Sequence, residues 1–192
     1  SLTKNKHKSM LKIGDYPIMA HLYTQLRINK ILEIFISTGH KSTVISNYCK
    51  LKIKSDSDKL LNISKNKKKY EYPKIIISKL KSNSSTTERI LEIKKKLNSE
   101  FIIIYGDTLL KPNVKKLYKL YNKRNAKIIM TISKPFPRFG TVQTKNERII
   151  TFSEKNIQNE PWVNSGWMLV SKFLLKRFTK KKINFEKYLF SN

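Results

Sequence analysis

The sequence predicts an α/β fold, with a Rossmann-like, mostly parallel sheet flanked by helices. Apolar runs of strand length alternate along the chain with segments whose apolar residues recur at helical spacing. The central run, Phe101–Ile104, has four consecutive apolar residues, as expected of a strand buried on both faces of a sheet. The 192 residues suit one domain with a sizeable core, and no internal repeat is visible.

The elements follow from local patterns taken in chain order. Asp15 suits the N-cap of a first helix and Pro17 its first turn. Ser85 and Glu88 have the spacing of a capping box, and Pro112 and Asn113 precede another apolar helical face. Residues 51–72 show no clear pattern, and their lysine run predicts a solvated loop. Strands are expected over 33–38, 74–80, 101–105, 127–133 and 163–170, with an antiparallel pair over 141–144 and 148–152.

The charge is strongly positive, with a formal net value of +28 from 41 Lys and Arg against 13 Asp and Glu. Such a balance attracts anionic partners. However, the abundance of Lys, Ile and Asn is typical of an AT-rich genome, and the lysines are spread along the chain. A nucleic-acid binder would carry a clustered basic face. We therefore expect no nucleic-acid partner, with a basic nucleic-acid-binding protein kept as an alternative.

Several function classes are excluded by composition. Cys49 is the single cysteine, so no internal disulfide forms, which fits a reducing, cytoplasmic location. No apolar run reaches membrane-spanning length, so no membrane partner is expected. No His and Cys cluster has the spacing of a zinc site, and the phosphate-binding P-loop motif and a serine nucleophile elbow are absent.

Charged and polar residues follow several predicted strands. Asp107 comes directly after the 101–104 run and Tyr105-Gly106, at the strand end where open α/β sheets bind ligands. Its carboxylate suits either a Mg²⁺ ligand or the cap of a turn or helix, and the local pattern favours neither. The other candidates are Lys8, Arg138, Glu154, Lys155 and Asn164. Cations that neutralise phosphates beside a metal fit phosphoryl or nucleotidyl transfer.

Six segments taken together resemble one known family. They are HKSMLKIGDYPIMAHL (7–22), IFISTGHKSTVISNY (34–48), FIIIYGDT (101–108), PRFGTV (137–142), ITFSEKN (150–156) and WVNSGWMLV (162–170). Their order and spacing resemble those of the sugar-1-phosphate nucleotidyltransferases, most closely the glucose-1-phosphate cytidylyltransferase subgroup. The resemblance covers nearly the whole chain and implies the nucleotide-diphospho-sugar transferase type of fold.

The resemblance implies a reaction and residue roles. The phosphate of a sugar 1-phosphate attacks the α-phosphorus of a nucleoside triphosphate, most simply CTP with glucose 1-phosphate, and pyrophosphate leaves. By resemblance, Lys8 neutralises phosphate charge and Asp107 is a catalytic Mg²⁺ ligand. The resemblance also assigns substrate-binding roles: the sugar hydroxyls and phosphate to Glu154 and Lys155, the sugar pocket to Asn164 and Gly166, and a further substrate contact to Arg138.

The sequence also departs from the family pattern. The family's first strand and its Gly-rich G-G-x-G-T-R loop would precede Ser1, and its second metal aspartate would follow Asn192. We therefore expect a single nucleotidyltransferase domain, 1–192, truncated at both ends and inactive alone. His7 and Ser9 replace prolines, and Thr108 replaces a glycine. Uridylyl or guanylyl transfer, a non-catalytic relative and a homo-oligomer all remain open.

Overall fold

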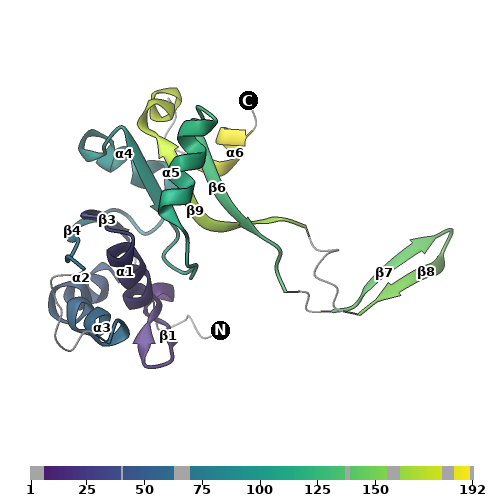
Figure 1. Ribbon diagram of the computed structural model, residues 1–192, viewed down its shortest axis with the longest axis horizontal. Helices are drawn as coiled ribbons and strands as arrows, with labels where there is room; N and C mark the ends of the chain where they lie inside the picture. Colours follow the sequence, from purple (N-terminus) through teal and green to yellow (C-terminus); the bar gives the residue numbers. More distant parts are fainter. Residues whose placement is uncertain are drawn as a thin grey trace.

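The computed structural model describes residues 7–39, 41–62, 70–136, 139–154, 161–178 and 184–190. Its alternating helices and strands confirm the α/β class (Figure 1). No helix in these ranges is long and apolar enough to cross a membrane. The elements are η1 (Lys8–Met10), β1 (Lys12–Ile13), β2 (Tyr16–Pro17), α1 (Ile18–Ile28), β3 (Glu33–Thr38), α2 (Ser42–Leu51), α3 (Ile53–Leu60), β4 (Lys74–Lys79), α4 (Thr86–Ile93), η3 (Lys94–Lys96), β5 (Glu100–Ile104), α5 (Val114–Lys123), β6 (Ile128–Ser133), β7 (Thr141–Lys145), β8 (Arg148–Ser153), β9 (Val163–Ser171), η5 (Lys172–Arg177) and α6 (Phe185–Phe190).

The strands of the body form two main sheets. Strands β3 and β4 pair in parallel, in register from Glu33 opposite Lys74 to Thr38 opposite Lys79. Strands β5, β9 and β6 form a second sheet in that order, and β9 is antiparallel to both neighbours. Strands β5 and β6 consequently run in the same direction, as the predicted βαβ alternation requires. The late strand β9 inserts between them.

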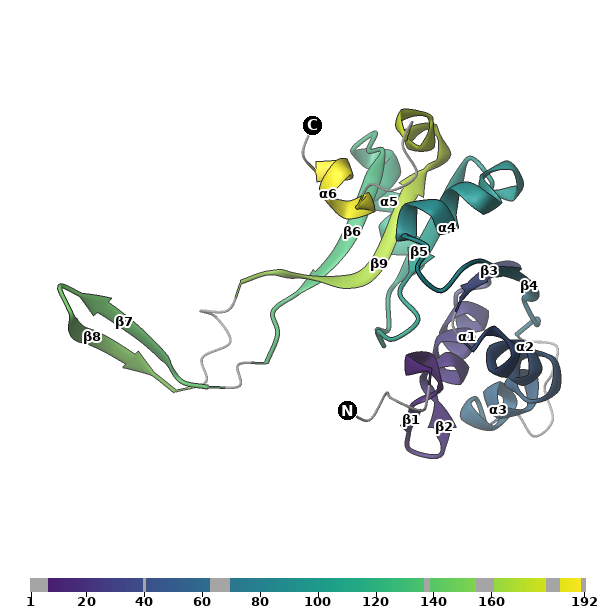
Figure 2. The same ribbon diagram turned by 180° about the vertical axis from the view of Figure 1, so that it is seen from behind.

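Helix α1 joins the two halves of the core. One side of α1 packs Ala20 and Tyr23 against Ile45 and the rest of α2. Ile18, Leu22 and Leu26, on another side, pack in one cluster with Trp167, which is fully buried in β9. This packing fixes the segment before α1 relative to β5 and β9 (Figure 2).

The N-terminal boundary of α1 differs from the prediction. The helix begins at Ile18 with Pro17 as its N-cap residue, and no side chain caps it. Asp15 lies instead in the turn between β1 and β2, next to Gly14, whose φ is +61°. The N-cap assignment of Asp15 is therefore wrong, because the two short strands bring the chain to the helix in extended conformation.

A buried ion pair organises the part of the chain where the sequence showed no pattern. The guanidinium of Arg27 is 2.9 Å from the carboxylate of Asp58, and its side chain is fully buried. It also donates to Ser57 Oγ at 2.8 Å and to the carbonyl of Tyr70 at 3.0 Å, and it lies over the ring of Tyr72. Polar contacts therefore hold α3 against α1.

Strands β7 and β8 form a hairpin that extends away from the rest of the molecule (Figures 1 and 2). The antiparallel pair was predicted over nearly the same residues. A register shift between Gln143 and Thr144 leaves one extra residue, Ile150, in β8.

Candidate active site

Lys8 and Asp107, the two residues assigned catalytic roles, meet in the structure. The ammonium Nζ of Lys8 lies 3.6 Å from Oδ2 of Asp107. Lys8 opens η1, and Asp107 lies in the turn directly after β5. Both side chains are open to solvent, at 67% and 45% exposed, so the pair contributes little to stability. Its importance is positional, because it sets one cation and one carboxylate side by side at the surface.

Ser9 holds Lys8 in this position. Ser9 is buried, and a Cβ placed on Gly106 would lie 3.8 Å from Ser9 Cβ, so η1 rests on the turn that carries Asp107. The backbone N–H of Ser9 donates to His7 Nδ1 at 3.3 Å, and the Ser9 hydroxyl lies 2.8 Å from the same nitrogen. His7 and Ser9 replace prolines of the family pattern, and they stabilise the turn by hydrogen bonds instead.

Gly166 and Asn164 flank the same turn from β9. The Tyr105 N–H donates to the Gly166 carbonyl at 3.0 Å. Gly166 has a φ of +81°, and a Cβ on it would lie 2.9 Å from Thr108, so only glycine fits beside this turn. The Gly166 N–H donates to Asn164 Oδ1 at 2.8 Å, and Asn164 is exposed. Gly166 at the entry of β9 therefore lies against the turn that carries Asp107, and Asn164 holds the backbone N–H of Gly166.

Thr108 was recognised in the sequence only as a departure from the family pattern. Its contact with Gly166 depends on β9 pairing beside β5, which local pattern cannot indicate. Ser9 was likewise noted as a departure, and its burial against Gly106 was not predicted.

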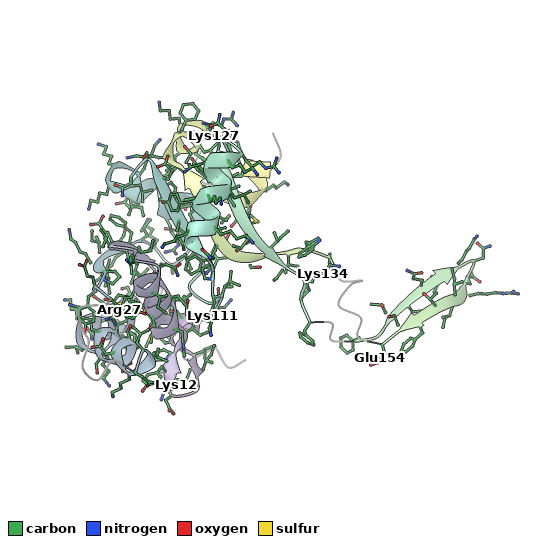
Figure 3. All side chains as sticks on the ribbon, viewed as in Figure 1. Lys12, Arg27, Lys111, Lys127, Lys134 and Glu154 are labelled. Atoms are coloured by element: carbon green, nitrogen blue, oxygen red, sulfur yellow. The ribbon has the colours of Figure 1, made fainter. Side chains whose placement is uncertain are left out.

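The remaining predicted site residues are not part of this cluster. Glu154 follows β8, and its Oε2 lies 3.2 Å from the position of a Cβ on Gly140. Figure 3 shows Glu154 at the base of the hairpin, away from the body of the molecule. Lys111, in the loop that follows Asp107, lies in the body. Arg138 and Lys155 lie outside the described residues. The structure therefore brings Glu154 to a different place from Asp107.

The helix-capping alternative for Asp107 loses its support, whereas its place in the turn after β5 leaves the turn-capping alternative open. Helix α5 begins at Val114, and its N-cap is Asn113, whose Oδ1 accepts the N–H of Lys116 at 2.9 Å. Asp107 lies well before this cap, and its carboxylate instead faces Lys8.

Asp107 fits a metal ion that is held mostly by substrate. Within the described ranges, no three His, Cys, Asp or Glu side chains gather as a metal site. Mg²⁺ is commonly bound by one or two carboxylates together with substrate phosphates. A single exposed carboxylate beside an exposed lysine is compatible with that arrangement.

Cys49 is not a candidate nucleophile. It lies in the core between α1 and α2, with its Sγ 3.8 Å from the sulfur of Met19. Burial raises the pKa of its thiol to about 11, so the reactive thiolate is scarce at neutral pH.

A comparison with protein families shows to which family the chain belongs. The family described as nucleotidyl transferase matches residues 1–188. The chain belongs to this nucleotidyl transferase family. The family resemblance inferred from the six sequence segments is confirmed, and with it the expectation that the chain belongs to an enzyme family.

Individual relatives are sugar-1-phosphate nucleotidyltransferases. The chain is 28% identical to D-glycero-alpha-D-manno-heptose 1-phosphate guanylyltransferase of Campylobacter jejuni, over 100% of this chain and 79% of the relative. It is 22% identical to glucose-1-phosphate cytidylyltransferase of Salmonella typhimurium, over 86% of this chain and 67% of the relative.

Solved structures of the same fold confirm the predicted nucleotide-diphospho-sugar transferase type. HddC from Yersinia pseudotuberculosis superposes with a TM-score of 0.70 at 19% identity, over 100% of this chain and 80% of that chain. A glucose-1-phosphate thymidylyltransferase homologue from Bacillus anthracis gives a TM-score of 0.62 at 17% identity, over 95% and 70%.

Proposed function

We propose that this nucleotidyltransferase joins a nucleoside triphosphate to a sugar 1-phosphate, in the cytoplasm, for nucleotide-sugar and polysaccharide biosynthesis. A phosphate oxygen of the sugar 1-phosphate forms a bond to the α-phosphorus. The bond from that phosphorus to the β-phosphate bridging oxygen breaks, and pyrophosphate leaves. The observation that carries the proposal is the pairing of Lys8 with Asp107 at the end of β5.

Lys8 acts on the phosphates in this proposal. Its ammonium is exposed and makes only a weak surface pair with Asp107, so it can exchange that carboxylate for a phosphate oxygen. A fixed cation beside the α-phosphate stabilises the negative charge that grows as the new bond forms. Ser9, buried on Gly106, keeps the lysine backbone in place during this exchange.

Asp107 is the residue proposed to hold Mg²⁺, with the remaining ligands from the triphosphate and water. The ion, when bound, neutralises phosphate charge and orients the α-phosphate. In this proposal the Asp107 carboxylate binds the metal ion and the Lys8 ammonium binds a phosphate. Weak pairing of the two in the free protein leaves both groups available to ligands.

Asn164 and Gly166 are proposed to border the sugar. An exposed amide can both accept from and donate to hydroxyls, and glycine keeps the backbone of β9 close to the site. For Glu154, Lys155 and Arg138 the sugar and phosphate contacts rest on the family resemblance alone.

The base and the sugar are proposed from the relatives. Heptose 1-phosphate guanylyltransferases from two bacteria align with 100% and 97% of this chain, which favours GTP with a heptose 1-phosphate. The second candidate is CTP with glucose 1-phosphate, which the motif order and the Salmonella cytidylyltransferase favour.

The test is pyrophosphate release by the natural full-length protein with Mg²⁺. GTP and CTP are each paired with a heptose 1-phosphate and with glucose 1-phosphate. We expect turnover with one pair at least about tenfold above the others in kcat/KM. No pyrophosphate release with any pair, from folded protein, would contradict the proposal and favour a non-catalytic relative.

A further inference from the structure

A pocket open to solvent lies between the C-terminal end of α1 and the segment that enters α5. Its volume is about 330 Å³, within the usual range for sites that bind small molecules. Three exposed lysines line it. Lys30 lies just beyond the C-cap of α1, Lys111 in the loop after Asp107, and Lys115 in the first turn of α5. The pocket therefore collects ammonium groups from three separate places in the chain.

No carboxylate balances these lysines. None of the residues that line the pocket is Asp or Glu. The two segments that form it also lack acidic residues, because the chain has no Asp or Glu over 16–32 or over 108–146. Within the part of the chain that the structure describes, Lys30, Lys111 and Lys115 form no ion pair. Three cations without a counter-charge raise the local positive potential, which attracts a small anion.

Hydrogen bonds hold the walls of the pocket together. Asn29 Oδ1 accepts the N–H of Val114 at 3.3 Å, and Asn29 Nδ2 donates to the carbonyl of Gln25 at 2.8 Å. Asn113 Oδ1 accepts the N–H of Lys116 at 2.9 Å. These bonds join the end of α1 to the start of α5 and occupy two N–H groups of the first turn of α5. The attraction for an anion therefore comes from the lysines rather than from the helix terminus.

The pocket is separate from the candidate active site. Neither Lys8 nor Asp107 lines it. Lys8 precedes the N-terminal end of α1, whereas the pocket lies at the C-terminal end of this 11-residue helix, which is about 16 Å long. An anion in the pocket is consequently a different ligand from the substrate phosphate proposed to contact Lys8.

We propose that this pocket binds a small polyphosphate anion of about the size of pyrophosphate. Several negative charges on one ligand match the three ammonium groups of Lys30, Lys111 and Lys115. Each phosphate also offers oxygens that accept charge-assisted hydrogen bonds from lysine. An anion with a single phosphate-sized group reaches fewer of the lysines at once, so the pocket favours the longer anion. The proposal does not depend on the reaction that the enzyme catalyses.

Isothermal titration of the natural full-length protein with pyrophosphate, at low salt and without Mg²⁺, tests the site. Lys30→Gly removes one ammonium group without straining the backbone, because Lys30 has a φ of +58°, where glycine is favoured. Lys41→Gly is the matched control, since Lys41 has a φ of +54° and does not line the pocket. Neither variant should lower the unfolding temperature. The titrations are repeated in protein carrying Lys8→Gln, so that pyrophosphate held by the candidate active site is not counted.

In the Lys8→Gln background we expect pyrophosphate to bind, with an affinity that falls at least about fivefold on adding Lys30→Gly or Lys115→Gln. Adding Lys41→Gly should change the affinity by less than about twofold. Sulfate at the same ionic strength should bind at least about tenfold more weakly than pyrophosphate. The proposal is overturned if Lys8→Gln alone abolishes binding, if Lys30→Gly and Lys41→Gly have equal effects, or if sulfate binds as tightly as pyrophosphate.

Discussion

Gly166 and Thr108 approach so closely that a Cβ on Gly166 would lie 2.9 Å from the Cβ and Oγ1 of Thr108. This contact joins the entry of β9 to the turn that carries Asp107. Because Gly166 has a φ of +81°, the backbone conformation and the close approach both require glycine. The candidate active site therefore depends on a residue with no side chain of its own.

Gly166→Ala should destabilise the protein by about 3 kcal/mol or more, because it adds a clash to left-handed backbone strain. Gly14→Ala is the matched control. Gly14 has a φ of +61°, but nothing lies within 4 Å of a Cβ placed on it, so strain alone should cost about 1 kcal/mol. Urea unfolding measures both. Equal losses for the two variants would show that the contact with Thr108 carries no energy.

Lys8→Gln should lower kcat by about a hundredfold, since no cation would then balance charge on the reacting phosphates. Lys8→Arg should keep part of the activity, because arginine preserves the positive charge but replaces the compact ammonium by a planar guanidinium. Steady-state pyrophosphate release measures both variants. Stability should change by less than about 0.5 kcal/mol, because the Lys8–Asp107 pair is exposed. Equal kcat values for Lys8→Gln and the wild type would remove Lys8 from the mechanism.

Asp58→Asn should destabilise the protein by about 2–3 kcal/mol, since it leaves the fully buried Arg27 without its carboxylate. Glu33→Gln breaks the exposed Lys74–Glu33 pair at 3.4 Å and should cost less than about 0.5 kcal/mol. Urea unfolding of the two variants at neutral pH measures the difference. A small loss for Asp58→Asn would mean that Ser57 and the Tyr70 carbonyl satisfy Arg27 by themselves.

Stability should fall as the pH rises above about 9. Burial raises the pKa of the Cys49 thiol from its ordinary value of 9.0 to about 11. Above pH 9 the unfolded chain has lost this proton while the folded chain keeps it, so the free energy of unfolding decreases until about pH 11, by up to about 1.4 kcal/mol per unit. Burial also raises the pKa of Tyr23 to about 12, which continues the decline.

Urea unfolding at pH 8 to 11 measures this loss, and Cys49→Ala isolates the thiol. The variant should lose stability less steeply between pH 9 and 11 than the wild type does. Parallel curves for the two proteins would contradict the assignment to Cys49.

The sequence predicts those parts of the fold that depend on interactions between residues close together in the chain. The capping box of Ser85 and Glu88 forms as predicted, and the apolar run 101–104 became β5. Helix α3 was missed, because the buried polar pair of Arg27 and Asp58 supports it and leaves no apolar period. The insertion of β9 between β5 and β6 depends on a contact between distant segments.

Part of the candidate site could likewise be predicted from the sequence. Asp107 was identifiable by its position after a strand, and the family resemblance identified Lys8. The sequence could not show that Ser9 packs on Gly106, or that Glu154 lies at the base of the β7–β8 hairpin, because tertiary packing determines both.

The central claim is that Asp107 holds the metal ion required for nucleotidyl transfer, beside Lys8. Its most direct test is Asp107→Asn in the natural full-length protein, with Mn²⁺ binding and pyrophosphate release measured on the same sample. Glu33→Gln is the matched control, because Glu33 is also an exposed carboxylate paired with a lysine. We predict that Asp107→Asn weakens Mn²⁺ binding in the presence of nucleotide and cuts kcat by about a hundredfold or more, while Glu33→Gln changes neither. Wild-type Mn²⁺ affinity and kcat in Asp107→Asn would contradict the account.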